Sequence, residues 1–178
     1  MSLGGEHRPL AEVTLSYRHR SKVRLDTCDK RAQYEPTYQG MMDRCYWDYV
    51  RVYAPSGSTL LTVEGADEQL VADQEKGKTV FAAYFVLAPG EHRQITFRYL
   101  LPTNILVQVD PESVNYELLV QKQPGTLSLP LQLRIEVWPG MKVVHAKPTP
   151  TEVGHEVVQH TTKLQLDRRF ELILRAAD

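Results

Sequence analysis

The amino-acid sequence predicts an all-β protein, an antiparallel β-sandwich of immunoglobulin-like or jelly-roll-like type with roughly eight to ten strands. Three observations lead to this fold class. Apolar and polar side chains alternate at period two in most segments, which is typical of strands with one buried face. The Pro/Gly turns APSGS, APGEH, KQPGT and WPGMK separate these segments. No long window has the period of an amphipathic helix, and only residues 71–77 suggest a single helical turn.

Each predicted strand follows from its own alternation. In chain order, the side chains expected to face a core are Val13, Leu15 and Tyr17 in EVTLSYR; Val50, Val52, Leu61 and Val63 in YWDYVRVYAPSGSTLLTVEG; Ile95, Phe97 and Tyr99 in QITFRYL; Val114, Tyr116, Leu118 and Val120 in VNYELLVQ; Leu127, Leu129, Leu131, Leu133, Ile135 and Val137 in LSLPLQLRIEVWPG; and Leu164, Leu166, Phe170, Leu172 and Leu174 in KLQLD and RFELILR. The segment TVFAAYFVLAP is apolar on both sides and predicts a central strand. Because Pro130 cannot donate a ladder hydrogen bond, its strand is predicted to lie at a sheet edge or to break there.

The length of 178 residues suits one domain, and such a chain buries about 70% of the surface that it exposes when unfolded. We expect residues 1–9 to be an engineered, disordered start and residues 10–178 to form a single β-sandwich domain. Within that domain, 26–45 is predicted as a cysteine-flanked loop and 145–156 as a Pro-rich connection.

Charge and hydropathy exclude several classes of protein. The net charge is −1 and its contributors are mixed along the chain, which argues against a nucleic-acid partner. The short basic stretch YRHRSKVR allows an anion patch, but a solvated strand face is the simpler interpretation. No apolar run approaches the length of a membrane span, and the start lacks the apolar centre of a signal peptide. Because MSLGG resembles an engineered start, an upstream targeting segment could have been removed.

Cys28 and Cys45 flank a polar, turn-rich insert between two predicted strands. We predict a disulfide between them, which would contribute about 3 kcal/mol by constraining the unfolded chain. Such a bond implies an oxidising compartment. The alternative is a pair of free thiols. A zinc site falls short of four ligands.

Motifs that carry chemistry are not convincing in this sequence. In GHEVVQH, His155 and His160 miss the spacing of a zinc-protease helix by one position and would lie on opposite faces of a strand, so an ordinary surface histidine is expected. The carboxylates Asp26, Asp29 and Asp43 surround the cysteine loop with Asp48, but their spacing does not demand the six or more oxygens of a calcium site. We therefore predict no enzyme, no catalytic residues, no cofactor and no metal.

Trp47, Tyr49, Arg51 and Tyr53 form the candidate ligand or partner face. Flat rings on a sheet suit stacking against sugars, with Arg51 adding hydrogen bonds. The simpler alternative is that the cysteine loop or a neighbouring domain covers these rings, since cross-strand aromatic side chains also stabilise sheets without a ligand. Solvent exposure of the rings distinguishes the two.

Three phrases occur in a familiar order: DYVRVYAPSGSTLLTVEG, GKTVFAAYFVLAPGEHRQITFRYLLP and YELLVQKQPGT, with LQLDRRFELIL towards the end. Together they resemble the C-terminal portion of the bacterial family catalogued as domain of unknown function four thousand and twelve. The resemblance covers 46–178 and leaves out 10–45. It implies an excised C-terminal domain of a larger protein with an N-terminal membrane helix and an extracytoplasmic position at the bacterial envelope. It implies no catalytic residues.

Three functional hypotheses remain. The first is a non-enzymatic, extracytoplasmic structural or interaction module of a larger bacterial envelope protein. Its partners would be other domains of the same protein, envelope proteins or glycans, and it would meet the membrane only through an N-terminal anchor. The second is a carbohydrate-binding module that uses the aromatic face. The third, a hydrolytic enzyme, would need ionisable groups converging in a pocket, of which the sequence gives no hint.

Overall fold

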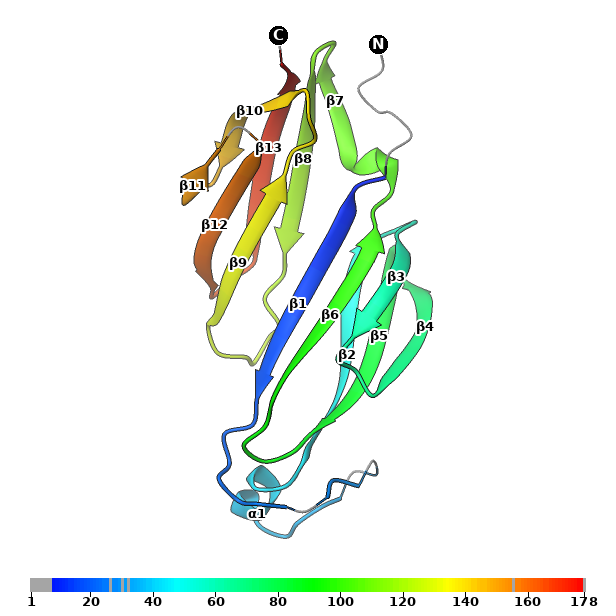
Figure 1. The fold of residues 1–178 in the computed structure, drawn as a ribbon, viewed down its shortest axis with the longest axis vertical. Helices are drawn as coiled ribbons and strands as arrows, with labels where there is room; N and C mark the ends of the chain where they lie inside the picture. The colour runs from blue at the N-terminus through cyan, green and yellow to red at the C-terminus, as the bar shows by residue number, and fades with distance from the viewer. Residues whose placement is uncertain (1–7, 26, 30, 32, 155, 178) are drawn as a thin grey trace. The chain divides into compact units, whose positions relative to one another are not determined.

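The computed structural model describes residues 8–25, 27–29, 31, 33–154 and 156–177, with the side chains of 70–72 left out. Most of the segment predicted as a disordered start lies outside these residues. The all-β prediction is confirmed, because the described chain consists of antiparallel sheets with one short helix and one 3-10 turn (Figure 1). No helix in the described chain is long and apolar enough to cross a membrane.

The chain divides into two compact units, which we call the N-terminal unit (Arg8–Pro102) and the C-terminal unit (Thr103–Asp178). The sequence led us to expect one domain over 10–178, and the structure differs from that expectation. Every sheet draws all of its strands from a single unit. Alternation tells that a strand has a buried face, but it does not tell which sheet that face meets.

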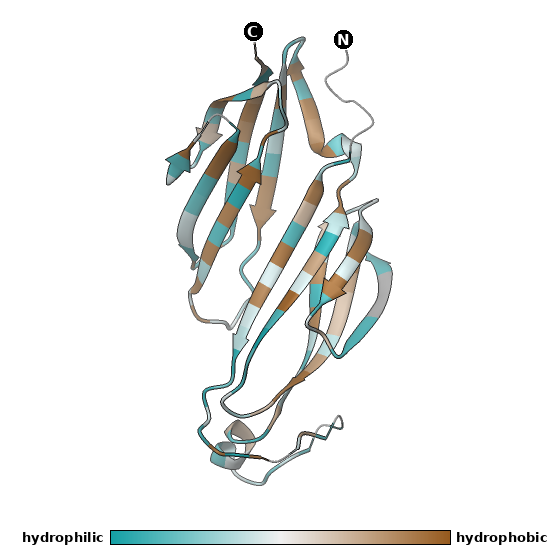
Figure 2. Cartoon of the chain, in the orientation of Figure 1, coloured by the Kyte–Doolittle hydropathy of each residue, from teal (hydrophilic) through white to brown (hydrophobic). Residues whose placement is uncertain are grey.

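Two three-stranded antiparallel sheets make up the N-terminal unit, with strand orders β1-β6-β3 and β2-β5-β4. Its elements are β1 (Leu10–Arg18), α1 (Tyr38–Met42), β2 (Tyr46–Pro55), β3 (Thr59–Glu64), β4 (Glu68–Glu75), β5 (Lys78–Leu87) and β6 (His92–Leu100). β5 is the central strand of its sheet, as its apolar sequence predicted. Alternating hydropathy is visible as bands along β1 and β6 (Figure 2).

The two sheets of the N-terminal unit bury their apolar faces against each other. Phe81 of β5 packs on Tyr99 of β6 with ring centroids 5.1 Å apart, and Phe85 of β5 packs on Tyr17 of β1 at 4.7 Å. Tilted aromatic contacts of this kind add to the burial of apolar area. The inward set predicted for β6 is confirmed, because all three of its side chains are buried.

Two local predictions in this unit are wrong. Leu61 was expected to face the core but is exposed, because the register of β3 against β6 shifts between Leu60 and Thr62 and turns the side chain outward. The helical turn predicted over 71–77 is the end of strand β4 and a tight turn. There Lys76 and Gly77 both have positive φ, and Glu75 pairs with Lys78.

The C-terminal unit contains a four-stranded sheet, β10-β13-β8-β7, and a three-stranded sheet, β11-β12-β9. Its elements are η1 (Thr103–Ile105), β7 (Leu106–Asp110), β8 (Ser113–Val120), β9 (Leu129–Glu136), β10 (Met141–Lys147), β11 (Glu152–Val153), β12 (Val157–Leu164) and β13 (Arg168–Ala176). The connection predicted over 145–156 includes the end of β10, a cis Lys147–Pro148 peptide and β11.

The core of the C-terminal unit lies between its sheets, where Val158 of β12 packs with Leu172 and Leu174 of β13. β9 lies at a sheet edge, as Pro130 predicted. The inward prediction fails for Leu127, Leu129 and Leu166, which are exposed. Leu127 and Leu166 lie outside the paired strands and Leu129 is the first residue of β9, so the sheet does not bury these positions.

The described chain has thirteen strands, more than the roughly eight to ten that the sequence predicted. The surplus comes from short or polar strands, of which β11 has two residues and β7 has five. Such strands carry too few alternating positions to produce a clear periodic signal.

Candidate functional site: the outer face of β2 and the cysteine loop

The outer face of β2 presents the predicted aromatic residues to solvent. Among the described strands β2 pairs only with β5 and lies at the sheet edge, and its inward positions include the buried Val50 and Ala54. Tyr49 and Tyr53 lie at the alternate positions and are 55% and 51% exposed. Period two therefore places these two rings on the side of the sheet away from the core.

Arg51, which lies between the two tyrosines, is held by its neighbours. Its guanidinium forms an ion pair with Glu75 of β4 and lies 5.1 Å from the ring centre of Tyr53. The Tyr53 hydroxyl donates to the same Glu75 carboxylate at 3.2 Å. Hydrogen bonds from Arg51 and then Tyr53 lower the pKa of Glu75. Arg51, Tyr53 and Glu75 thus hold one another in place on the protein surface.

The β5 residues that lie opposite Tyr53 and Arg51 are aliphatic. β5 runs between β2 and β4, and in register Val80 lies opposite Tyr53 while Ala82 lies opposite Arg51. Directly opposed residues of an antiparallel pair share a face. Val80 and Ala82 are nevertheless only 1% and 3% exposed. Neither residue therefore contributes open surface to the site.

Trp47 differs from the rest of the predicted face. It lies on the same side of β2, but its ring is half-buried and its indole Nε1 donates to the backbone oxygen of Asp29 at 2.8 Å. Asp29 belongs to the cysteine loop, directly after Cys28. The structure therefore brings Tyr49, Arg51 and Tyr53 together as an open surface and places Trp47 against the loop.

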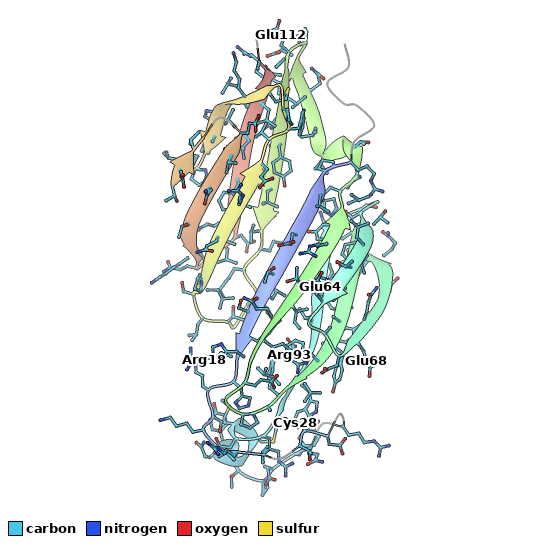
Figure 3. All side chains as sticks on the ribbon, in the orientation of Figure 1. Arg18, Cys28, Glu64, Glu68, Arg93 and Glu112 are labelled. Atoms are coloured by element: carbon cyan, nitrogen blue, oxygen red, sulfur yellow. A yellow bond between two sulfur atoms is a disulfide. The ribbon has the colours of Figure 1, made fainter. Side chains whose placement is uncertain are left out.

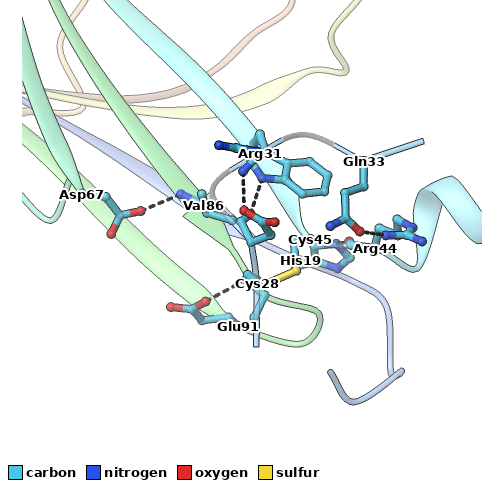
Figure 4. The surroundings of a disulfide bond; sticks show 12 residues. His19, Cys28, Arg31, Gln33, Arg44, Cys45, Asp67, Val86 and Glu91 are labelled. Carbon is cyan, nitrogen blue, oxygen red and sulfur yellow. Dashed lines mark hydrogen bonds between the residues drawn. A yellow bond between two sulfur atoms is a disulfide. The ribbon is translucent and has the colours of Figure 1, made fainter. Parts of the chain in front are cut away.

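The predicted disulfide joins Cys28 to Cys45, with their Cα atoms 6.0 Å apart (Figures 3 and 4). Cys45 is buried next to the start of β2. The loop between the two cysteines contains α1, which is capped by the hydroxyl of Thr37 accepting from the Gly40 amide. Arg44 pairs with Glu35 inside the loop. The disulfide thus ties a partly structured loop to the end of the N-terminal unit.

A tyrosine–aspartate cluster that the sequence reasoning missed lies on the inner side of β2. The hydroxyls of Tyr17 and Tyr46 donate to the half-buried carboxylate of Asp48. Burial raises the pKa of Asp48, and burial together with the Asp48 charge raises the pKa of Tyr17 well above its usual range. The alternation along β2 could have predicted the position of Asp48. Asp48 lies two residues before the inward-facing Val50, so both side chains face the same side of the strand. These groups stabilise one another and leave the two phenols protonated at neutral pH.

The carboxylates near the cysteine loop do not converge. Asp29 accepts from the Arg31 amide, Asp43 accepts from Ser21 and Gln39, and Asp48 belongs to the tyrosine cluster. Asp26 lies outside the described residues. Within the described part of the chain, no group of three or more His, Cys, Asp or Glu side chains has metal-binding geometry.

The histidine pair of GHEVVQH does not form a site in the described chain either. His155 lies outside the described residues. The prediction of a surface histidine is wrong for His160, which is buried between the sheets of the C-terminal unit. The fixed period of β12 points His160 inward along with Val158 and Leu164.

No protein-family model, curated protein or solved structure matches this chain. The resemblance to domain of unknown function four thousand and twelve therefore stays a prediction.

Proposed function

We propose that the chain is a non-enzymatic, extracytoplasmic structural or interaction module of a larger bacterial envelope protein, anchored in the membrane through an N-terminal segment of that protein. The observation that carries the location is the Cys28–Cys45 disulfide, because such bonds persist in oxidising compartments and are rare in the cytosol.

The charged surface supports a structural role. Arg98 of β6 pairs with Glu12 of β1 on one side and Glu64 of β3 on the other, which links all three strands of that sheet. Arg169 of β13 pairs with Glu117 of β8 in the same manner. These charges stabilise strand pairing, each by a modest amount at an exposed position.

The experiment that tests the proposal compares the chain produced with and without an export signal in one bacterium, with thiols alkylated before lysis. We expect the exported chain to have no free thiols and the cytosolic chain to have two. A photo-crosslinker at Tyr49 in the full-length protein should then join this unit to another domain of that protein or to an envelope component. Free thiols in the exported chain, or full-length protein recovered only from the cytosol, would contradict the proposal.

A second candidate function is carbohydrate binding by Tyr49, Arg51 and Tyr53. The observation that favours it is the exposure of the two rings, since rings buried under the loop would have removed it. A glycan array followed by titration should show a bound glycan whose affinity falls in Tyr49→Ala and Tyr53→Ala. Tyr34→Ala is the matched control, because Tyr34 is an exposed tyrosine of the cysteine loop. An array without any bound glycan eliminates this candidate.

A further inference from the structure

Four basic side chains lie in one short segment where β1 ends and the cysteine loop begins. Arg18, Arg20, Lys22 and Arg24 occupy alternate positions, and all four are exposed. We call these four residues the basic strip. No acidic residue occurs between Arg18 and Arg24. Figure 3 labels Arg18 where β1 ends.

The residues between the basic side chains hold the segment in place. The His19 amide donates to the Glu91 oxygen at 2.9 Å, and its ring Nε2 donates to the Arg44 oxygen at 2.7 Å. The Ser21 amide donates to Nδ1 of the same ring, and the Ser21 hydroxyl donates to Asp43 at 2.6 Å. These bonds turn His19 and Ser21 towards the protein. His19 and Ser21 are partly buried, whereas the flanking Arg18, Arg20 and Lys22 are exposed.

The basic strip is not neutralised within the described chain. Several other arginines of the unit have acidic partners, for example Arg44 with Glu35 and Arg93 with Asp67 and Glu91. No described acidic side chain forms an ion pair with any of the four strip residues.

The two acidic residues that contact the strip segment both have hydrogen-bond partners of their own. Glu91 accepts from the Ala88 amide and from Arg93, and Asp43 accepts from Ser21 and Gln39. Asp43 thus brings one carboxylate next to Ser21, between Arg20 and Lys22 in sequence, but neither Asp43 nor Glu91 forms an ion pair with a strip residue among the described contacts.

The strip borders a hollow of about 520 Å³, lined by Arg18, His19, Arg20, Ser21, Lys22 and Gly90. Gly90 lies in the turn between β5 and β6 and has a φ of +79°. A side chain at this position would start 3.6 Å from the Ser21 backbone oxygen. Gly90 itself places no side chain in this hollow, so the side chains that line it come from the strip segment.

We propose that the basic strip binds a linear anionic polymer whose negative charges recur along its backbone, namely a phosphodiester-linked envelope glycopolymer. Four exposed cations distributed along residues 18–24 suit an anion that recurs along a chain better than a single compact one. Arginine forms paired hydrogen bonds to phosphate oxygens. Each exposed contact is weak, so affinity comes from several contacts and from released counterions.

Nucleic acid and anionic membranes fit the strip less well. Single-stranded nucleic acid is usually held by aromatic stacking platforms as well as by charge, and the segment from Arg18 to Arg24 contains no tyrosine, tryptophan or phenylalanine. A membrane surface would favour apolar side chains next to the charges, and Val23 is the only aliphatic side chain within the segment.

The test titrates the purified, oxidised chain with poly(glycerol phosphate) at several salt concentrations. We expect Arg20→Gln/Lys22→Gln to weaken binding about tenfold or more at low salt and to lower the salt slope by about two charges. Arg134→Gln/Lys163→Gln is the matched control, because it removes the same charge from exposed strand positions of the C-terminal unit and should leave the affinity unchanged.

Several results would overturn the proposal: no binding, equal weakening in both double variants, equal affinity for monomeric glycerol phosphate, or tighter binding to oligothymidylate or to phosphatidylglycerol vesicles at the same phosphate concentration. The choice of polymer rests on the proposed envelope location. The titration uses the purified chain, so its failure is distinguishable from failure of the export experiment.

Discussion

The imidazole of His160 lies edge-on to the ring of Phe170, with ring centroids 4.8 Å apart, between the two sheets of the C-terminal unit. His160 is 4% exposed and Phe170 is fully buried. Nε2 of this histidine has no hydrogen-bond partner among the described residues. Burial lowers its pKa from the ordinary value of 6.5, because a charged imidazole is poorly solvated there.

This histidine should make the C-terminal unit sensitive to acid. The unfolded chain takes up a proton near pH 6.5 and the folded chain resists it, so the free energy of unfolding falls as pH drops below about 6.5. We expect His160→Phe to reduce this loss between pH 7 and pH 5, whereas His145→Gln at an exposed position of β10 should not. Urea unfolding in a Trp47→Phe background leaves Trp138 as the reporter of this unit. An unchanged pH dependence in His160→Phe would contradict the assignment.

Gly65 and Gly77 offer a matched pair for testing close backbone packing. Both have positive φ, at +80° and +71°, but a Cβ at Gly65 would overlap the backbone oxygen of Gln94, whereas a Cβ at Gly77 meets nothing within 4 Å. Gly77→Ala should cost about 1 kcal/mol of unfolding free energy from backbone strain alone. Gly65→Ala should cost about 3–5 kcal/mol. The measurement is urea unfolding followed by Trp47 fluorescence in a Trp138→Phe background, and equal costs would show that the Gly65 contact is absent.

Lys76 has a φ of +48°, which a lysine adopts at a cost. It is followed by Gly77 in the two-residue turn that joins β4 to β5, where Asn-Gly is the preferred pair. Lys76→Asn should therefore raise the free energy of unfolding by about 0.5–1 kcal/mol. Lys78→Asn, at the first residue of β5, is the control and should bring no gain. A destabilised Lys76→Asn variant would argue against this turn geometry.

Regular strands were the part of the fold that local pattern could predict. In β13 the inward set Phe170, Leu172 and Leu174 is buried, because eight consecutive residues pair with β8 without a register shift. The prediction fails where that regularity ends. Leu61 lies at a register shift and Leu166 lies between two strands. Neither feature has a period that can be read from neighbouring residues.

The candidate site was predictable to the same extent. The alternation of side chains along β2 predicted that Tyr49 and Tyr53 lie on its outer face. The contact of Trp47 with Asp29 and the hydrogen bond from Tyr17 to Asp48 each join segments that lie far apart in sequence. Such contacts depend on how the sheets and the loop come together, so no local window contains them.

The disulfide should account for a substantial share of the stability of the N-terminal unit. Cys28 and Cys45 are separated by 17 positions, and closing a loop of this size in the unfolded chain contributes about 3 kcal/mol. Cys28→Ser/Cys45→Ser should lower the free energy of unfolding by about that amount when Trp47 is the reporter and by little when Trp138 is. Cys28→Ala/Cys45→Ala is the control for placing a hydroxyl at the buried Cys45 position, and the oxidised and reduced wild-type chains give the same comparison without mutation. If reduction leaves Trp47-detected unfolding unchanged, the bond holds only the loop and the sandwich of the N-terminal unit is stable without it.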